Sequence, residues 1–323
     1  SADENVQIKR LTVNNHDSEQ RTLEFASYGE VTLASAKADM AHPAFSNLFV
    51  ETEYLEEFDA ILFSRRKRSS SETQHYLFHL FTAGVVFAPI SADSSKFSFI
   101  GRGRNRENPI GLSKSSTGKF GTVLDPIFSL KNLVELNPNS SQEMYFITGY
   151  CNSRNEAINL IKKYKEISYI NRSFELAWSH ADIELRNLNF SPSTLNVVNS
   201  ILLGLSNNIA EYRAPAEILK KANSPINTLW RLGISGDEPI VLLKLNDENP
   251  KNYLEELITA QEYLRIRGII FDLVVLTESH GGYQQTFEDE IDFTIKTSPA
   301  RDRLDRTGGV FVRSILNLSD QEI

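Results

Sequence analysis

The sequence predicts an α+β protein of several domains: an antiparallel β-sandwich, then a helical linker, then a small α/β module. Residues 1–150 alternate apolar and polar side chains in short runs, residues 151–224 change to helical spacing, and residues 225–323 alternate apolar runs with helical segments. Period-two alternation is typical of strands, and spacing of three to four residues is typical of helices. We therefore expect a β-sandwich domain over 1–150, a helical linker over 151–224 and a βαβαβ module over 225–323.

The expected sandwich is built from short strands separated by polar turns. Runs such as Val6–Lys9 alternate in hydropathy, and polar clusters such as Asn14–Asp17 separate them. Many short strands with polar turns favour a sandwich. By the same criteria Phe97–Phe99 reads as a strand and Ser91–Ser95 as a turn.

The helical region begins with a candidate capping box, Ser153–Glu156, in which the hydroxyl and the carboxylate would satisfy free backbone N–H groups. A second helix is expected over Ser168–Asn187, with Trp178 on its buried side. A third is expected from Ser191-Pro192, because serine caps helices and proline suits their first turn.

The last region alternates buried strands with helices. Pro239–Leu243, Ile269–Leu276 and Gly309–Val312 read as strands, with helices opening at Asn249-Pro250 and lying within 282–296. Strands that alternate with helices in this way predict a small parallel sheet with right-handed crossovers.

The composition argues against several classes of function. The 323 residues carry 34 basic and 42 acidic side chains, for a net charge of −8, which disfavours nucleic acid as a partner. The single cysteine, Cys151, excludes a disulfide framework and suits a reducing compartment. No apolar run approaches the ~18–20 residues that span a bilayer, so we expect no direct membrane insertion by this segment.

We expect no cofactor and no metal. Gly101–Arg106 has arginine where a dinucleotide fingerprint needs its third glycine, and Gly111–Lys119 has the wrong spacing for a P-loop. His75 and His79 share a face but have no clear third ligand, and packed or surface histidines explain them more simply.

Four residues are candidates for carbohydrate binding: Arg102, Arg104, Trp230 and Asp237. Arginine and aspartate offer donors and acceptors to sugar hydroxyls, and tryptophan, which we expect in a loop at this position, offers a stacking face. The alternatives are that the arginines lie in a solvated turn or pair with the chain's surplus carboxylates, and that Asp237 stabilises the loop after Gly233.

Asp237 and Glu278 are also a candidate carboxylate pair. A glycosidase needs two carboxyl groups about 5–10 Å apart across the sugar, and the sequence does not place these two. Asp272, inside an apolar strand, reads as a buried carboxylate that must find a partner.

Several segments in order resemble the cyclic β-1,2-glucan synthase family and its relatives, the β-1,2-oligoglucan phosphorylases of glycoside hydrolase family 94. The segments are Tyr28–Leu33, Ala41–Tyr54, Gly101–Asn105, Gly121–Leu130, Leu229-Trp230 with Gly233–Asp237, Asp272–Leu276 and Gly309–Val312. The resemblance covers nearly the whole chain, and His42–Phe45 and Gly121–Pro126 are its most specific stretches.

The resemblance implies a very large parent protein that joins a membrane-embedded glycosyltransferase to a phosphorylase-like half. This chain would be a sandwich segment upstream of the catalytic (α/α) barrel, cytoplasmic within an inner-membrane-anchored parent. No segment matches the barrel's catalytic residues, so the resemblance assigns none here.

The leading hypothesis is therefore a noncatalytic segment, inactive alone, that scaffolds the barrel and binds β-1,2-glucan. Its partners would be the glucan and the remaining domains of the parent. Two alternatives stay open: a self-sufficient small carbohydrate-active enzyme using Asp237 and Glu278, and a pure protein-interaction module.

Overall fold

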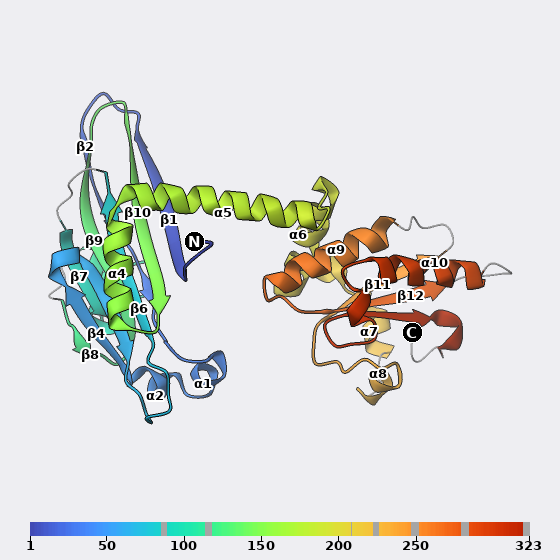
Figure 1. Ribbon diagram of the computed structural model, residues 1–323. Coiled ribbons are helices and arrows are strands. Elements are labelled where there is room, and N and C mark those ends of the chain that lie inside the picture. Colours follow the sequence, from blue (N-terminus) through green and yellow to red (C-terminus); the bar gives the residue numbers. More distant parts are fainter. Residues whose placement is uncertain are drawn as a thin grey trace. The chain divides into compact units, whose positions relative to one another are not determined.

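The computed structural model describes residues 1–84, 89–113, 118–207, 209–221, 226–246, 252–278 and 284–318. The chain forms two compact units, Ser1–His180 and Ala181–Ile323 (Figure 1). Antiparallel sheets dominate the first unit, and a small parallel sheet with helices forms the second. The predicted α+β class is confirmed.

The described residues of the first unit form two antiparallel sheets. The larger has six strands in the order β1-β10-β6-β5-β4-β8. Its strands are β1 (Val6–Asn15), β4 (Val50–Leu55), β5 (Ala60–Arg65), β6 (Tyr76–Ala83), β8 (Gly121–Thr122) and β10 (Ser140–Cys151). In the second sheet β2 (Arg21–Ala26), β3 (Gly29–Glu30) and β7 (Pro89–Ser95) all pair with β9 (Pro126–Leu136).

Strand β5, in the middle of the larger sheet, is buried on both faces. Ile61 and Phe63 of β5 pack between the two sheets, in one cluster with Leu130 of β9. Ala60 and Leu62 of the same strand point to the opposite face and a second cluster. Burial on both faces explains why β5 reads as a continuous apolar run and not as an alternating one.

Two helices supply the cover for the second face. Helix α4 (Arg154–Lys165) and the start of α5 (Ile167–Asn187) contribute Ile161, Tyr164 and Ile170 to the same cluster as Leu62. Figure 1 shows α4 lying against the sheet at β6 and β10. The first unit therefore has three layers: sheet, sheet and helix.

The structure confirms the capping box at the start of α4. Ser153 Oγ accepts the Glu156 N–H at 3.1 Å, and a Glu156 carboxylate oxygen accepts the Asn152 N–H at 3.2 Å. In the usual capping box the glutamate accepts from the N-cap residue, here Ser153, and in this structure its donor lies one residue earlier, at Asn152. The box fixes where α4 begins.

Three sequence predictions in this unit are wrong. Phe97–Phe99 lies in a short helix, α3 (Lys96–Ile100), because three residues are too few to separate the two periods. Ser91–Ser95 lies in β7, where Ser94 is buried and bonds the Thr52 hydroxyl at 2.8 Å. Trp178 of α5 is 80% exposed, although helical spacing placed it on the buried side.

Short helices α1 (Ala36–Ala41) and α2 (Pro43–Asn47) precede β4 in the first unit. In the second unit the strands are β11 (Ile240–Asn246), β12 (Asp272–Glu278) and β13 (Val310–Ser314). Its helices are α6 (Pro192–Ser206), α7 (Ala216–Lys221), α8 (Asn227–Arg231), α9 (Asn252–Ile266) and α10 (Gln284–Thr297). None of the helices in the described ranges is long and apolar enough to cross a membrane.

The second unit packs helices on a parallel sheet of order β11-β12-β13, so the predicted parallel pairing is confirmed. Leu273 and Val275 of β12 share a cluster with residues of α6, α9 and α10, and Val274 on the opposite face packs with Phe311. Residues of the predicted helical region 151–224 thus contribute to two cores, through α4 in one unit and α6 in the other.

Candidate functional site

The predicted arginines lie in one exposed loop of the first unit. Gly101 and Gly103 have φ values of +84° and +73°, which glycine adopts without strain, and they shape the turn that presents Arg102 and Arg104. Both arginines are exposed, and Arg104 donates to the Asn108 side chain at 3.4 Å. The loop therefore offers solvent-facing donors.

Trp230 and Asp237 lie in the second unit, on α8 and in the loop that follows it. The Trp230 indole N–H donates to the Ser235 carbonyl at 3.1 Å, and the Asp237 backbone N–H donates to the Ser235 hydroxyl at 3.2 Å. Trp230 lies in α8 and not in a loop as predicted, and it is 60% exposed. The structure brings these two residues together around Ser235 and leaves the indole ring open.

Asp237 and Glu278 do not form the predicted carboxylate pair. In the parallel register Ile240 pairs with Asp272, and Asn246 pairs with Glu278. Asp237 precedes the first of these pairs, whereas Glu278 closes the last, six residue steps further along the sheet. At about 3.3 Å per residue that is roughly 20 Å, well beyond the ~5–10 Å of a glycosidase.

Asp272 is fully buried at the start of β12. One carboxylate oxygen accepts the Gly308 N–H at 2.6 Å, and the other has no hydrogen-bond partner in the described structure. Burial raises the pKa of Asp272 above its usual value, and the nearby charges of Glu238 and Asp237 raise it further. Asp272 thus anchors the turn before β13, with half of its hydrogen-bonding capacity unused.

His79 is a packed histidine. It is 2% exposed, its ring nitrogens lie 2.9 Å from the hydroxyls of Thr148 and Ser27, and its ring stacks on Phe128 at 4.0 Å. Burial lowers the pKa of His79 to about 3, so the ring is neutral. No group of three or more potential metal ligands occurs within the described ranges.

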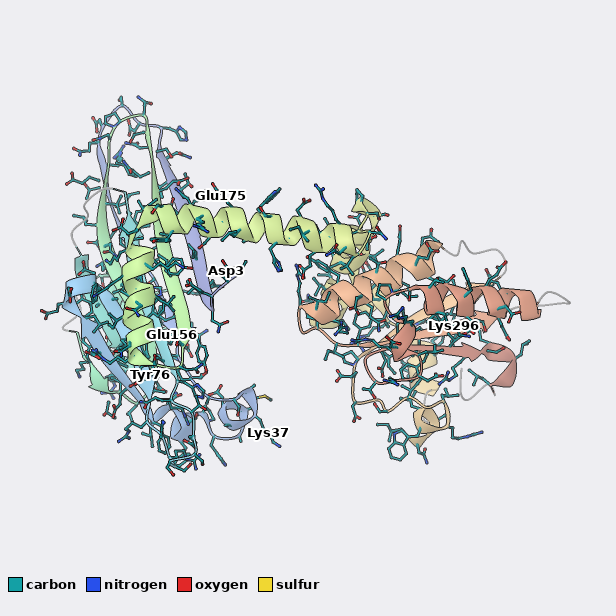
Figure 2. All side chains as sticks on the ribbon, viewed as in Figure 1. Asp3, Lys37, Tyr76, Glu156, Glu175 and Lys296 are labelled. Atoms are coloured by element: carbon teal, nitrogen blue, oxygen red, sulfur yellow. The ribbon has the colours of Figure 1, made fainter. Side chains whose placement is uncertain are left out.

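Sequence reasoning missed a polar hollow on the α4 face of the larger sheet, which we name the β4 depression. Its volume is about 300 Å³. It is lined by Glu51, Thr52, Glu53, Leu62, Ser64, Tyr76, Gly121, Thr122 and Arg154. Figure 2 labels Tyr76, at the start of β6, and Glu156, in the first turn of α4.

Strand register builds the floor of this depression. Thr122 of β8 pairs with Glu51 of β4, Glu51 pairs with Ser64 of β5, and Ser64 pairs with Tyr76 of β6. Paired residues of neighbouring antiparallel strands share a face, so these four side chains form one polar row. Glu53 stands in the next row beside Leu62, which is 3% exposed.

Two ion pairs border the depression. Glu53 bonds Arg154, the first residue of α4, at 2.7 Å, and Glu51 meets Arg66 at 3.3 Å. Each of the four side chains is about half exposed. Alternation along β4 places both glutamates on one face, but the sequence does not reveal that α4 leaves this face open.

The depression joins segments far apart in the chain. Ala41–Tyr54 and Gly121–Leu130, both among the stretches quoted for the family resemblance, meet where β4 pairs with β8. The sequence marked both segments through the resemblance, but only the structure shows that they pair.

The first unit is thus a two-sheet antiparallel sandwich whose larger sheet carries a helix on its outer face. The family model described as "Glycosyl hydrolase 94, supersandwich domain" matches residues 1–167. The chain belongs to this family, as the sequence resemblance predicted.

A curated relative extends the similarity beyond the sandwich. The chain is 31% identical over 287 residues to "Cyclic beta-(1,2)-glucan synthase NdvB" of Rhizobium meliloti (strain 1021). The aligned residues are 88% of this chain and 10% of that protein. The chain therefore spans about a tenth of the length of this relative.

Proposed function

We propose that this chain is a noncatalytic segment of a cyclic β-1,2-glucan synthase or a related glycoside phosphorylase, where it scaffolds the catalytic barrel. The supersandwich match over residues 1–167 carries the proposal. The separation of Asp237 from Glu278 along the sheet supports the noncatalytic part, because these were the candidate acids.

Glucan binding is the second part of the proposal. In the second unit the open ring of Trp230 offers an apolar platform for a sugar, and Asp237 beside it offers an acceptor. In the first unit Arg102 and Arg104 offer donors. The proposed ligand is β-1,2-glucan, which is the product class in the printed name of the NdvB relative.

The parent's setting follows from the same proposal. The chain would lie on the cytoplasmic side of an inner-membrane-anchored protein, with the remaining domains of that protein as its partners. The net charge of −8 supports a role without nucleic acid.

Calorimetric titration of the chain with linear β-1,2-gluco-oligosaccharides tests glucan binding, with cello-oligosaccharides as the control. We expect saturable heat with the β-1,2 series alone, weakened by Trp230→Ala. An absence of heat with both series would refute glucan binding and leave two possible roles, a scaffold or a pure interaction module. A stable complex with the barrel segment would then support a role in protein contacts.

Catalysis is tested separately. The chain alone should release no glucose 1-phosphate from β-1,2-glucan and phosphate. The noncatalytic assignment would be refuted if the chain released glucose 1-phosphate and Asp237→Asn abolished that release while circular dichroism showed an intact fold. Such a result would favour the self-sufficient enzyme.

A further inference from the structure

We infer that the β4 depression is an oligosaccharide subsite in the sandwich, separate from the Trp230 loop. The inference rests on the proposed glucan binding and assigns part of it to Glu51, Glu53, Arg154 and Tyr76.

The charges of the site favour a neutral ligand. Glu51 and Glu53 are each paired with an arginine, so the four charges sum to zero. An anion would meet two carboxylates, and a metal cation would have to displace both arginines from them. An uncharged polyhydroxylated ligand avoids both costs.

The groups that face the hollow suit sugar hydroxyls. The carboxylates accept hydrogen bonds, the Arg154 guanidinium donates them, and the hydroxyls of Ser64 and Thr122 do either. Tyr76 adds an aromatic side chain and Leu62 an apolar floor, which match the C–H surface of a sugar ring. The volume of about 300 Å³ lies at the lower end of the range for ligand pockets.

The position of Arg154 is locally unfavourable. A cation in the first turn of a helix opposes the helix dipole, which favours negative charge there. Its ion pair with Glu53 is half exposed, and such pairs contribute at most about 1 kcal/mol to stability. Folding stability therefore gives little reason for an arginine at this position, whereas donation to a ligand gives one.

The hollow is open because α4 stops short of β4. The helix packs chiefly on β6 and β10, so β4 and β8 continue the sheet beyond its cover (Figure 1). Elsewhere on this face apolar side chains meet the helix, but the uncovered part carries Glu51 and Thr122 of the polar row.

Calorimetric titration of the full chain and three variants tests the inference, with both oligosaccharide series as probes. Glu53→Gln removes the charged acceptor and Arg154→Gln the charged donor. Glu143→Gln is the matched control: it lies on the same sheet, is paired with Arg10 at 4.0 Å, and is outside the depression. Far-UV circular dichroism verifies that each variant folds.

We expect Glu53→Gln and Arg154→Gln each to weaken binding about tenfold, the effect of losing one charge-assisted hydrogen bond, and Glu143→Gln to leave it unchanged. Because the site and the ligand are both neutral overall, affinity should change less than twofold between low and high salt.

The outcomes separate this inference from the proposed function. Binding of the β-1,2 series that neither variant weakens would overturn the subsite while glucan binding stands. Binding of the cello series alone, lost in Glu53→Gln, would support the subsite and overturn the β-1,2 preference. No heat in the unaltered chain would overturn both.

Discussion

A fall in pH should destabilise the sandwich, because His79 takes up a proton in the unfolded chain before it does so in the folded one. The ring lies between the two sheets and both of its nitrogens contact hydroxyls. The pKa of His79 is about 3 in the folded chain, against 6.5 for the free side chain. A histidine with a lowered pKa keeps its full stabilising effect above pH 6.5, and the effect is lost as pH falls from 6.5 towards 3.

The size of the effect follows from this difference. At pH 5 the unfolded chain binds a proton at His79 and the folded chain does not, which costs about 2 kcal/mol relative to pH 7.5. The cost grows by about 1.4 kcal/mol per pH unit until the folded ring titrates. That is a large share of the ~5–15 kcal/mol that stabilises a typical domain.

Two measurements check the reasoning. Imidazole NMR signals of His79 should show no titration between pH 8 and pH 5. Hydrogen exchange at β6 and β10 amides reports the free energy of unfolding of this unit alone. Between pH 7.5 and pH 5 this free energy should fall by about 2 kcal/mol less in His79→Gln than in the unaltered chain. An NMR midpoint near 6.5, or equal losses in the two proteins, would refute the argument.

Other predictions concern single buried groups and the third layer. Cys151 is 2% exposed and its pKa is raised to about 11 by burial, so a thiol reagent at pH 8 should label it in urea but not in the folded chain. Asp272 has a raised pKa, so the native state loses stability as pH rises above about 4, and Asp272→Asn should gain stability over the unaltered chain from pH 4 to pH 7 in urea titrations. A chain of residues 1–150 should bind a hydrophobic dye strongly, because it lacks the α4 side chains, whereas residues 1–180 should not.

The fold was largely predictable because its elements are long and periodic. Strands β11, β12 and β13 and helices α9 and α10 appeared in the predicted order, since buried parallel strands give apolar runs and helices carry clear start signals, whereas α7 and α8 were not predicted. The errors fell where tertiary packing overrode local pattern. At Ser94 a hydroxyl finds a partner inside the sandwich, so a polar segment became a strand.

The candidate sites were harder to predict, because they depend on pairing between distant segments. Trp230 and Asp237 are seven residues apart and could be grouped from the sequence. Asp237 and Glu278 could not, because their separation is fixed by the register of two strands. Likewise, nothing in the sequence pairs Glu51 with Thr122, 71 residues further along the chain.

The chain connection that completes the fold also builds the β4 depression. The sheet needs an apolar cover, and α4 provides it immediately after β10: Cys151 ends the strand and Arg154 begins the helix. So short a connection forces the helix to start above the end of the sheet, where Cys151 pairs with Tyr76. Arg154 therefore comes within 2.7 Å of Glu53 as a consequence of packing. The packing of α4 thus fixes the position of residue 154, and the arginine there is a choice of side chain on an unchanged fold.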